Sequence, residues 1–244
     1  MGGAMLRRWI AAGADPATIT VIDPWAKDLP EGVTVLTEPG EGAPEVLVLA
    51  VKPQQLDAMP RLKAGVLISI LAGVEEAALA SRFDAGAVVR AMPNLPVSLG
   101  RGVVALHGGD AEARHVAETL MAPLGIVEWI GEEKLFDAVT ALSGSGPGFV
   151  YRFLEALAEG GAGLGLPADQ ALRFAVATVE GAAALAAASG EPPAVLAERV
   201  ASPGGTTRAG LNVLDHDHAL QDLIAATLDA AAKRSAELAA AARG

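Results

Sequence analysis

The feature that most restricts the fold is a change of pattern near residue 131. Before it, short apolar runs rich in β-branched residues alternate with helical stretches, which is typical of βαβ units and a mostly parallel sheet. One run, Val46–Val51, is apolar at every position, as expected of a central strand with helices on both faces. The other runs are Ile19–Asp23, Val33–Leu36, Val66–Ile70, Ala87–Ala91, Val103–His107 and Ile126–Trp129. Residues 1–131 are therefore predicted to form a doubly wound α/β domain.

After Gly131 the β-branched runs end and a helical periodicity continues through residues 132–244. Glu132 and Glu133 are expected in the first turn of the first helix, where negative charge is favourable. The small-residue stretch 181–188 allows helices to approach closely, so an all-helical domain of this kind gains most by packing on a second copy of itself. We predict a helical dimerisation domain.

Charge and composition exclude several classes of protein. With 18 Lys and Arg against 29 Asp and Glu, the net charge of -11 opposes binding to nucleic acid. There is no cysteine, so disulfides and thiolate metal sites are excluded. Uninterrupted apolar stretches such as Ala64–Val74 are shorter than the roughly 18–20 residues a bilayer needs, and no secretory signal is evident at the N-terminus. A cytoplasmic protein with no membrane partner is expected.

The first residues look like part of a dinucleotide-binding βαβ unit. Met1, Gly2 and Gly3 precede an amphipathic helix, and a strand that ends at Asp23 follows. In that interpretation the first strand of the unit is missing. Asp23 has the spacing of the acidic residue that binds a ribose 2′-hydroxyl, which would favour NADH, but an Asp-Pro turn explains it equally well.

Polar residues follow two predicted strands. Ala50, Val51, Lys52 and Pro53 leave the central strand at its carboxyl end, and Asn94 follows a later strand. Open α/β sheets bind their ligands at this edge. A solvated lysine and a simple turn at Asn94 are the alternatives.

Two glycine-rich segments are expected to bring backbone close to a ligand. Residues 143–148, SGSGPG, are predicted to separate two helices, and residues 202–207, SPGGTT, precede another helix and resemble a carboxylate-binding turn. Helix capping is the alternative for the first segment. The acidic and histidine-rich stretch 215–218 is interpreted as a helix start with Asp217 as N-cap rather than as a metal site, and no metal is expected.

The segments LAVKPQ at 49–54, RAMPNLP at 90–96, AVTALSGSGPG at 138–148 and ASPGGTTRAGL at 201–211 together closely resemble the pyrroline-5-carboxylate reductase family. The resemblance implies a Rossmann-type domain that binds NADPH or NADH, a helical dimerisation domain, and homodimers that can assemble further into a decamer. It implies substrate contacts from Ser143, Gly144, Ser145, Gly146, Pro147, Ser202, Gly204, Gly205, Thr206 and Thr207. Cofactor contacts are expected from Met1, Gly2, Asp23, Ala50, Val51, Lys52, Pro53 and Asn94.

The implied reaction is hydride transfer to the imine of 1-pyrroline-5-carboxylate, with the hydroxyl of Thr207 facing the ring nitrogen. The chain departs from the family pattern at Leu95, Gly148 and Phe149. A related 3-hydroxyacid dehydrogenase is the alternative enzyme. It would need a catalytic lysine in the helical domain, where Lys134 and Lys233 lie outside the glycine-rich segments. A helical dimer without catalytic activity is the alternative from another class.

Overall fold

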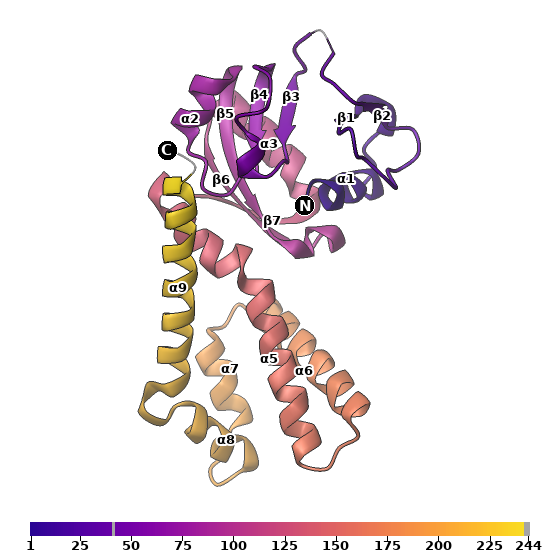
Figure 1. Ribbon diagram of the computed structural model, residues 1–244. Coiled ribbons are helices and arrows are strands. Elements are labelled where there is room, and N and C mark those ends of the chain that lie inside the picture. Colours follow the sequence, from indigo (N-terminus) through magenta and orange to yellow (C-terminus); the bar gives the residue numbers. More distant parts are fainter. Residues whose placement is uncertain (41, 242–244) are drawn as a thin grey trace. The chain divides into compact units, whose positions relative to one another are not determined.

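The computed structural model describes residues 1–40 and 42–241, so the last three residues of the predicted second domain lie outside the described part. Its first half alternates strands and helices as predicted (Figure 1). The strands are β1 (Thr20–Ile22), β2 (Thr34–Leu36), β3 (Val46–Leu49), β4 (Lys63–Ser69), β5 (Asp84–Pro93), β6 (Gly102–Gly108) and β7 (Gly125–Trp129). The helices between them are α1 (Gly2–Ala11), α2 (Glu76–Arg82) and α3 (Ala111–Met121).

Five strands form one sheet in the order β3-β4-β5-β6-β7. All neighbours in this sheet run parallel except β5 and β6, which are antiparallel. The strands β1 and β2 pair with each other in parallel as a separate sheet, and within the described residues β3 pairs with β4 alone. The predicted α/β class and mostly parallel sheet are confirmed, while the antiparallel pair was not predicted. The strand within Val46–Val51, predicted to be central, lies at the edge of the described sheet.

Apolar cores lie on both faces of the five-stranded sheet. Successive residues of a strand point to opposite faces, and in β4 the side chain of Leu67 packs in one core while Ile68 packs in the other. The core that contains Ile68 also holds Met5 of α1 and Met121 of α3, and the core that contains Leu67 also holds Leu79 of α2. Helices therefore cover both faces, as a doubly wound sheet requires.

The second half of the described chain is helical. It contains a 3₁₀ turn (Glu133–Leu135), α4 (Phe136–Val139), a π-helical turn (Thr140–Gly144), α5 (Gly146–Gly163), α6 (Ala168–Ser189), α7 (Pro193–Val200), α8 (Thr206–Leu214) and α9 (Ala219–Ala241). By packing, Met1–Pro147 and the residues from Ala230 onward form one compact unit, and Gly148–Asp229 forms a second. The boundary at residue 131 marks a change in sequence pattern, whereas the boundary after Pro147 marks a change in packing. The two need not coincide, because a helical segment can pack on a sheet.

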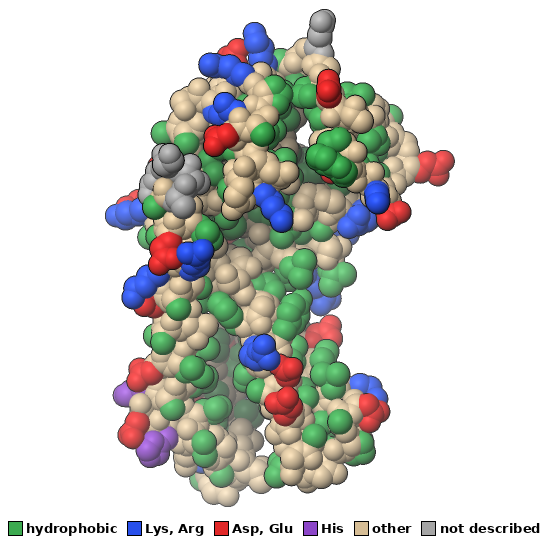
Figure 2. Space-filling model, viewed as in Figure 1, with side chains coloured by type: hydrophobic (Ala, Val, Ile, Leu, Met, Phe, Trp, Pro, Cys, Tyr) green, Lys and Arg blue, Asp and Glu red, His purple; other side chains and the backbone are tan. Residues whose placement is uncertain are grey.

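The two units differ in how they treat apolar side chains. In the second unit, hydrophobic side chains lie on the surface of the helices (Figure 2), including Tyr151, Phe153, Leu172 and Phe174, each about half exposed. Among the described residues, α6 is long and apolar enough to cross a membrane by length and composition. The prediction considered uninterrupted apolar runs, whereas this helix carries three widely spaced charges, Asp169, Arg173 and Glu180, and the absence of a membrane partner stays a prediction.

Candidate functional site

The carboxyl end of β3 meets the start of α1. A Cβ atom on Gly2 would lie 2.8 Å from the Cβ of Ala50, so the absence of a side chain lets the helix approach the strand closely. The first backbone N–H groups bonded within the helix are those of Ala4 and Met5, which donate to the carbonyl of Met1. The N–H groups of Gly2 and Gly3 belong to the first turn of α1, where backbone N–H groups have no acceptor within the helix. These amides fit the phosphate groups of a dinucleotide.

The segment after β3 turns sharply at Lys52. Pro53–Gln55 form a 3₁₀ turn, and the backbone N–H of Lys52 donates to the side-chain oxygen of Gln55 at 3.0 Å. The Lys52 side chain is exposed, and Val51 and Pro53 are half-buried beside it. The structure thus places Gly2 beside Ala50, at the start of the segment that leads to Lys52 and Pro53, and the role of these residues in cofactor binding stays a prediction.

Asp23 follows β1 and is exposed. Its Oδ1 accepts a hydrogen bond from the backbone N–H of Trp25 at 2.9 Å, and its own N–H donates to the carbonyl of Leu36. The first of these bonds is an Asx turn, the geometry that the turn interpretation predicts. Because a carboxylate accepts several hydrogen bonds, the turn leaves capacity for a ribose hydroxyl.

The segment from Ser143 to Pro147 is helical except at Ser145, which lies between a π-helical turn and α5, so it joins two helical elements without the open connection that was predicted. Thr140–Gly144 form a π-helical turn that leads directly into α5. The backbone N–H of Ser145 donates to the carbonyl of Thr140 at 2.8 Å, a bond that spans five residues. Glycines signal backbone freedom, and here that freedom serves a widened turn within a helix, a feature often found at functional sites.

Asn94 lies directly after β5 and is 7% exposed. Its Oδ1 accepts from the backbone N–H of Val103 at 2.9 Å, and its Nδ2 donates to the carbonyl of Ser143 at 3.0 Å. The side chain is thus engaged with the π-helical turn, not extended into open space.

The segment Ser202–Thr207 lies in the second unit, between α7 and α8. Gly204 has a φ of 72°, a conformation that favours glycine, and Gly205 is the N-cap of α8. A Cβ on Gly205 would lie 2.5 Å from the hydroxyl oxygen of Ser202, so the turn requires glycine here as well. The N–H groups of the first turn of α8 are therefore presented without covering side chains, as a carboxylate-binding turn requires.

The hydroxyls of Thr206 and Thr207 have no hydrogen-bond partner within residues 1–40 and 42–241. Threonines elsewhere in helices, such as Thr140 and Thr227, donate to a backbone carbonyl four residues earlier. Behind the turn, Arg208 forms an ion pair with Glu198 that links α7 and α8. The hydrogen bond that the Arg208 guanidinium donates to this carboxylate raises the pKa of Arg208.

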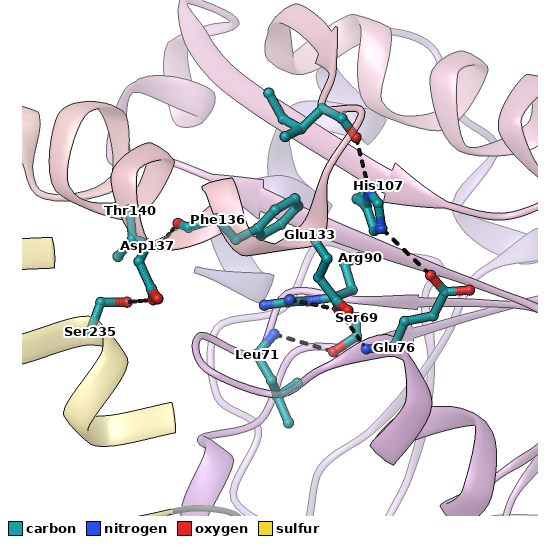
Figure 3. A network of polar contacts seen from close by, with 11 residues as sticks. Ser69, Leu71, Glu76, Arg90, His107, Glu133, Phe136, Asp137, Thr140 and Ser235 are labelled. Carbon is teal, nitrogen blue, oxygen red and sulfur yellow. Dashed lines mark hydrogen bonds and ion pairs between the residues drawn. The ribbon is translucent and has the colours of Figure 1, made fainter. Parts of the chain in front are cut away.

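A network of charged side chains that the sequence did not reveal joins the sheet to the start of the helical segment (Figure 3). Arg90 of β5 is buried, and its Nη1 lies 2.8 Å from Oε1 of Glu133. The same carboxylate oxygen accepts from the backbone N–H of Glu76 at 2.7 Å, at the start of α2. The guanidinium carbon of Arg90 lies 4.4 Å from the centre of the Phe136 ring. The sequence signal that could have indicated this network is an arginine, Arg90, within an otherwise apolar strand.

Burial of Glu133 by itself would raise its pKa. The backbone N–H of Glu76 and the guanidinium of Arg90 outweigh that effect, so the pKa of Glu133 is lowered overall. Nearby, Nδ1 of His107 in β6 donates to the carbonyl of Ile130, 2.8 Å away, and its Nε2 lies 3.7 Å from a carboxylate oxygen of Glu76. We interpret this network as structural, because it connects α2, the sheet and the turn before α4.

Within the described ranges, no group of three or more His, Cys, Asp or Glu side chains is arranged to hold a metal ion. In the stretch 215–218, α9 begins at Ala219, so Asp217 does not precede it directly as an N-cap. Asp217 instead has a φ of 49° within a 3₁₀ turn, which corrects the prediction.

The predicted site residues therefore fall into two sets. The first unit contains the predicted cofactor residues and the segment Ser143–Pro147, and the second unit contains Ser202–Thr207. In the first unit the structure brings together α1 with the end of β3, and Asn94 with Ser143. Asp23 directly follows β1 of the separate two-stranded sheet.

Comparison with known proteins gives consistent results. Residues 133–238 match the family profile of pyrroline-5-carboxylate reductase dimerisation. The pyrroline-5-carboxylate reductase of Pseudomonas aeruginosa is 35% identical over 98% of this chain and 93% of its own length. That of a Synechocystis strain is 41% identical over 80% of this chain and 75% of its own length.

A solved structure gives the same result as these sequences. A pyrroline-5-carboxylate reductase from Coxiella burnetii superimposes with a TM-score of 0.86 at 32% identity, covering 96% of this chain and 93% of the other. The match thus includes the sheet, the glycine-rich turns and the helical segment. The chain belongs to the pyrroline-5-carboxylate reductase family.

Proposed function

We propose that this chain reduces the imine of 1-pyrroline-5-carboxylate to proline with NADH or NADPH. The observation that carries the proposal is the pair of exposed backbone amide sets: those at the start of α1 beside Ala50, and those at the start of α8 in the turn from Ser202 to Thr207. The first set suits the phosphates of a dinucleotide and the second suits a substrate carboxylate.

The cofactor would be held by the N–H groups of Gly2 and Gly3, by the segment Ala50–Pro53, and by Asp23 at the ribose. When bound, the reduced nicotinamide supplies the hydride that reaches carbon 5 of the imine. The exposed Lys52 adds positive charge at this edge of the sheet. A carboxylate at Asp23 repels a 2′-phosphate, so we propose NADH as the preferred cofactor, and a preference above about tenfold for NADPH would contradict this.

The substrate carboxylate would be bound by the amides of Gly204, Thr206 and Thr207, with Ser202 beside them, since the amide of Gly205 donates to the carbonyl of Ser202. The free hydroxyl of Thr207 would hold the proton at the ring nitrogen, which keeps the imine electrophilic at carbon 5. The segment Ser143–Pro147 would shape the pocket through its helical backbone. No strong general base is required, because the residues mainly orient the substrate.

The proposal is tested by the decrease of near-ultraviolet absorbance as reduced cofactor is consumed in the presence of 1-pyrroline-5-carboxylate. Thr207→Ala is expected to lower kcat by roughly 10- to 100-fold, the effect of losing a hydrogen bond to a charged group, with an unchanged cofactor Kd. Thr207→Ser should retain most activity. Thr18→Ala, an exposed threonine in a distant turn, is the matched control. If neither cofactor is consumed by the folded chain, the proposed function is wrong.

We also propose that the chain is a homodimer that assembles into decamers, and that it is cytoplasmic. The dimerisation profile matched by residues 133–238 and the exposed apolar helices support self-association. Burial of α6 against a second copy would explain its apolar surface without a membrane. The absence of cysteine and the acidic composition suit a reducing cytoplasm.

A further inference from the structure

The side chain of Asn94 is fixed at both ends. Its Oδ1 accepts from the N–H of Val103, and the backbone of the same two residues forms a second bond, from Asn94 N–H to the Val103 carbonyl at 3.2 Å. Its Nδ2 donates to the carbonyl of Ser143 at 3.0 Å. One partner is a donor and the other is an acceptor, so this network determines the orientation of the amide. Val103 belongs to β6, whose pairing with β5 anchors Asn94.

The carbonyl of Ser143 needs this partner for a reason visible in the sequence. In an α-helix it would accept from the N–H four residues later, which is position 147. Pro147 has no N–H, so that bond cannot form. The amide of Asn94 therefore supplies a donor that the helix lacks, from a different element of the same unit.

The turn that Asn94 supports has few other means of holding its shape. The hydroxyls of Thr140 and Ser143 donate to carbonyls four residues earlier within the helix, those of Phe136 and Val139. Figure 3 shows the first of these bonds. The glycines at 144 and 146 contribute no side chain. Among the described residues, Asn94 is the side chain that hydrogen-bonds to the backbone of this turn from outside the helix.

We propose that Asn94 is a positioning residue, which holds the π-helical turn Thr140–Gly144, and with it the segment Ser143–Pro147, in the shape needed to accept the imine, and which does not itself contact the nicotinamide. The inference rests on the proposed function. It implies that the side chain acts on kcat through the Ser143 carbonyl, while binding of the cofactor depends on other residues.

The first test is Asn94→Asp. An aspartate keeps the acceptor for Val103, but when ionised it places an oxygen against the Ser143 carbonyl in place of a donor. We expect kcat to fall about 5- to 100-fold at neutral pH, the range for a buried carbonyl left without its partner. The NADH Kd should change less than about twofold. As the pH falls, the protonated acid again donates, so the ratio of variant to wild-type kcat should rise. The two groups that this side chain contacts, the N–H of Val103 and the carbonyl of Ser143, are uncharged backbone groups.

The second test uses Pro147→Ala, which restores an N–H four residues after Ser143. In this background Asn94→Asp should cost much less than in the wild type, because the helix now supplies its own donor. Gln221→Glu, an exposed amide on α9, controls for the change in charge. A rise in cofactor Kd that matches the fall in kcat, or equal costs in both backgrounds, would overturn the proposal.

A third readout does not depend on catalysis. Hydrogen exchange at the Ser145 amide, which donates to Thr140, should be faster in Asn94→Asp than in the wild type and should slow again when Pro147→Ala is added. Unchanged exchange would contradict the positioning role even if activity falls. If the wild type reduces no imine but exchange responds as expected, then the proposed reaction fails and the role of Asn94 in shaping the turn stands.

Discussion

The sheet unit and the helical unit bury their apolar residues in opposite ways. In the sheet unit large side chains such as Leu67, Ile68 and Leu79 are fully buried between strands and helices. In residues 148–229 the buried apolar residues are alanines, at 171, 175 and 201, while large aromatic and aliphatic side chains remain on the surface. The sheet unit can therefore fold around its own core, whereas the helical unit needs another surface to cover it.

The largest effect is expected from Phe174→Asp on α6, which tests whether the exposed apolar face of the helical unit is covered by a second copy. The Phe174 side chain is 52% exposed. In a symmetric dimer the substitution occurs twice in the interface. Each lost phenylalanine removes about 1.5–3 kcal/mol of the free energy of association, so the dimer Kd should rise roughly a thousandfold. Analytical ultracentrifugation measures this.

The matched control is Ile126→Asp on β7, 62% exposed in the sheet unit, which should leave the dimer intact. A dimer that tolerates Phe174→Asp would show that this face of α6 is not the interface.

A substitution at Glu133 tests whether the start of the helical segment stabilises the sheet unit. Glu133→Gln removes the charge that pairs with Arg90, and because the carboxylate is partly exposed we expect a loss of about 1–2 kcal/mol in the free energy of unfolding of the sheet unit. The folded pKa of Glu133 is lowered, so this contribution is fully present above its unfolded pKa and disappears as the pH falls through the folded pKa.

The measurement is chemical denaturation at several pH values from neutral to acid. The difference between wild type and variant should shrink towards acid pH, and the dimer Kd should not change. A pH-independent difference would show that the charge of Glu133 is not its contribution. Glu132→Gln, whose carboxylate pairs with Lys134 on the surface, is the control.

The smallest effect is expected from adding a strand beside β3, which lies at the edge of the described sheet. Fusing an apolar strand and a Gly-x-Gly turn before Met1 should give this edge a neighbour and hold the amides of Gly2 and Gly3 in place. We expect NADH to bind about tenfold more tightly, measured by quenching of tryptophan fluorescence. A Gly/Ser fusion of equal length is the control. Equal Kd values for the two fusions would mean that the present loops hold the dinucleotide without such a strand.

The sequence by itself determined the local elements, whereas the ligand-binding roles proposed for its segments stay predictions. The residue patterns typical of strands and of helices involve only residues close together in the chain, so they can be recognised from the sequence. Each of the seven predicted runs overlaps a strand, and the described chain after Gly131 is helical. The carboxyl ends of strands followed by polar residues predicted where Lys52 and Asn94 would lie. The role of Asp23 stays a prediction, because its observed turn is compatible with both interpretations.

Only the tertiary structure decided how distant segments pair. The direction of β6 against β5, the separation of β1 and β2 from the main sheet, and the return of the residues from Ala230 to the first unit depend on partners far apart in the chain. The glycine-rich segment at 143–148 shows the reason most clearly. Its glycines allow many conformations, and the selection of a π-helical turn depends on an amide 49 residues away that replaces the N–H that Pro147 lacks.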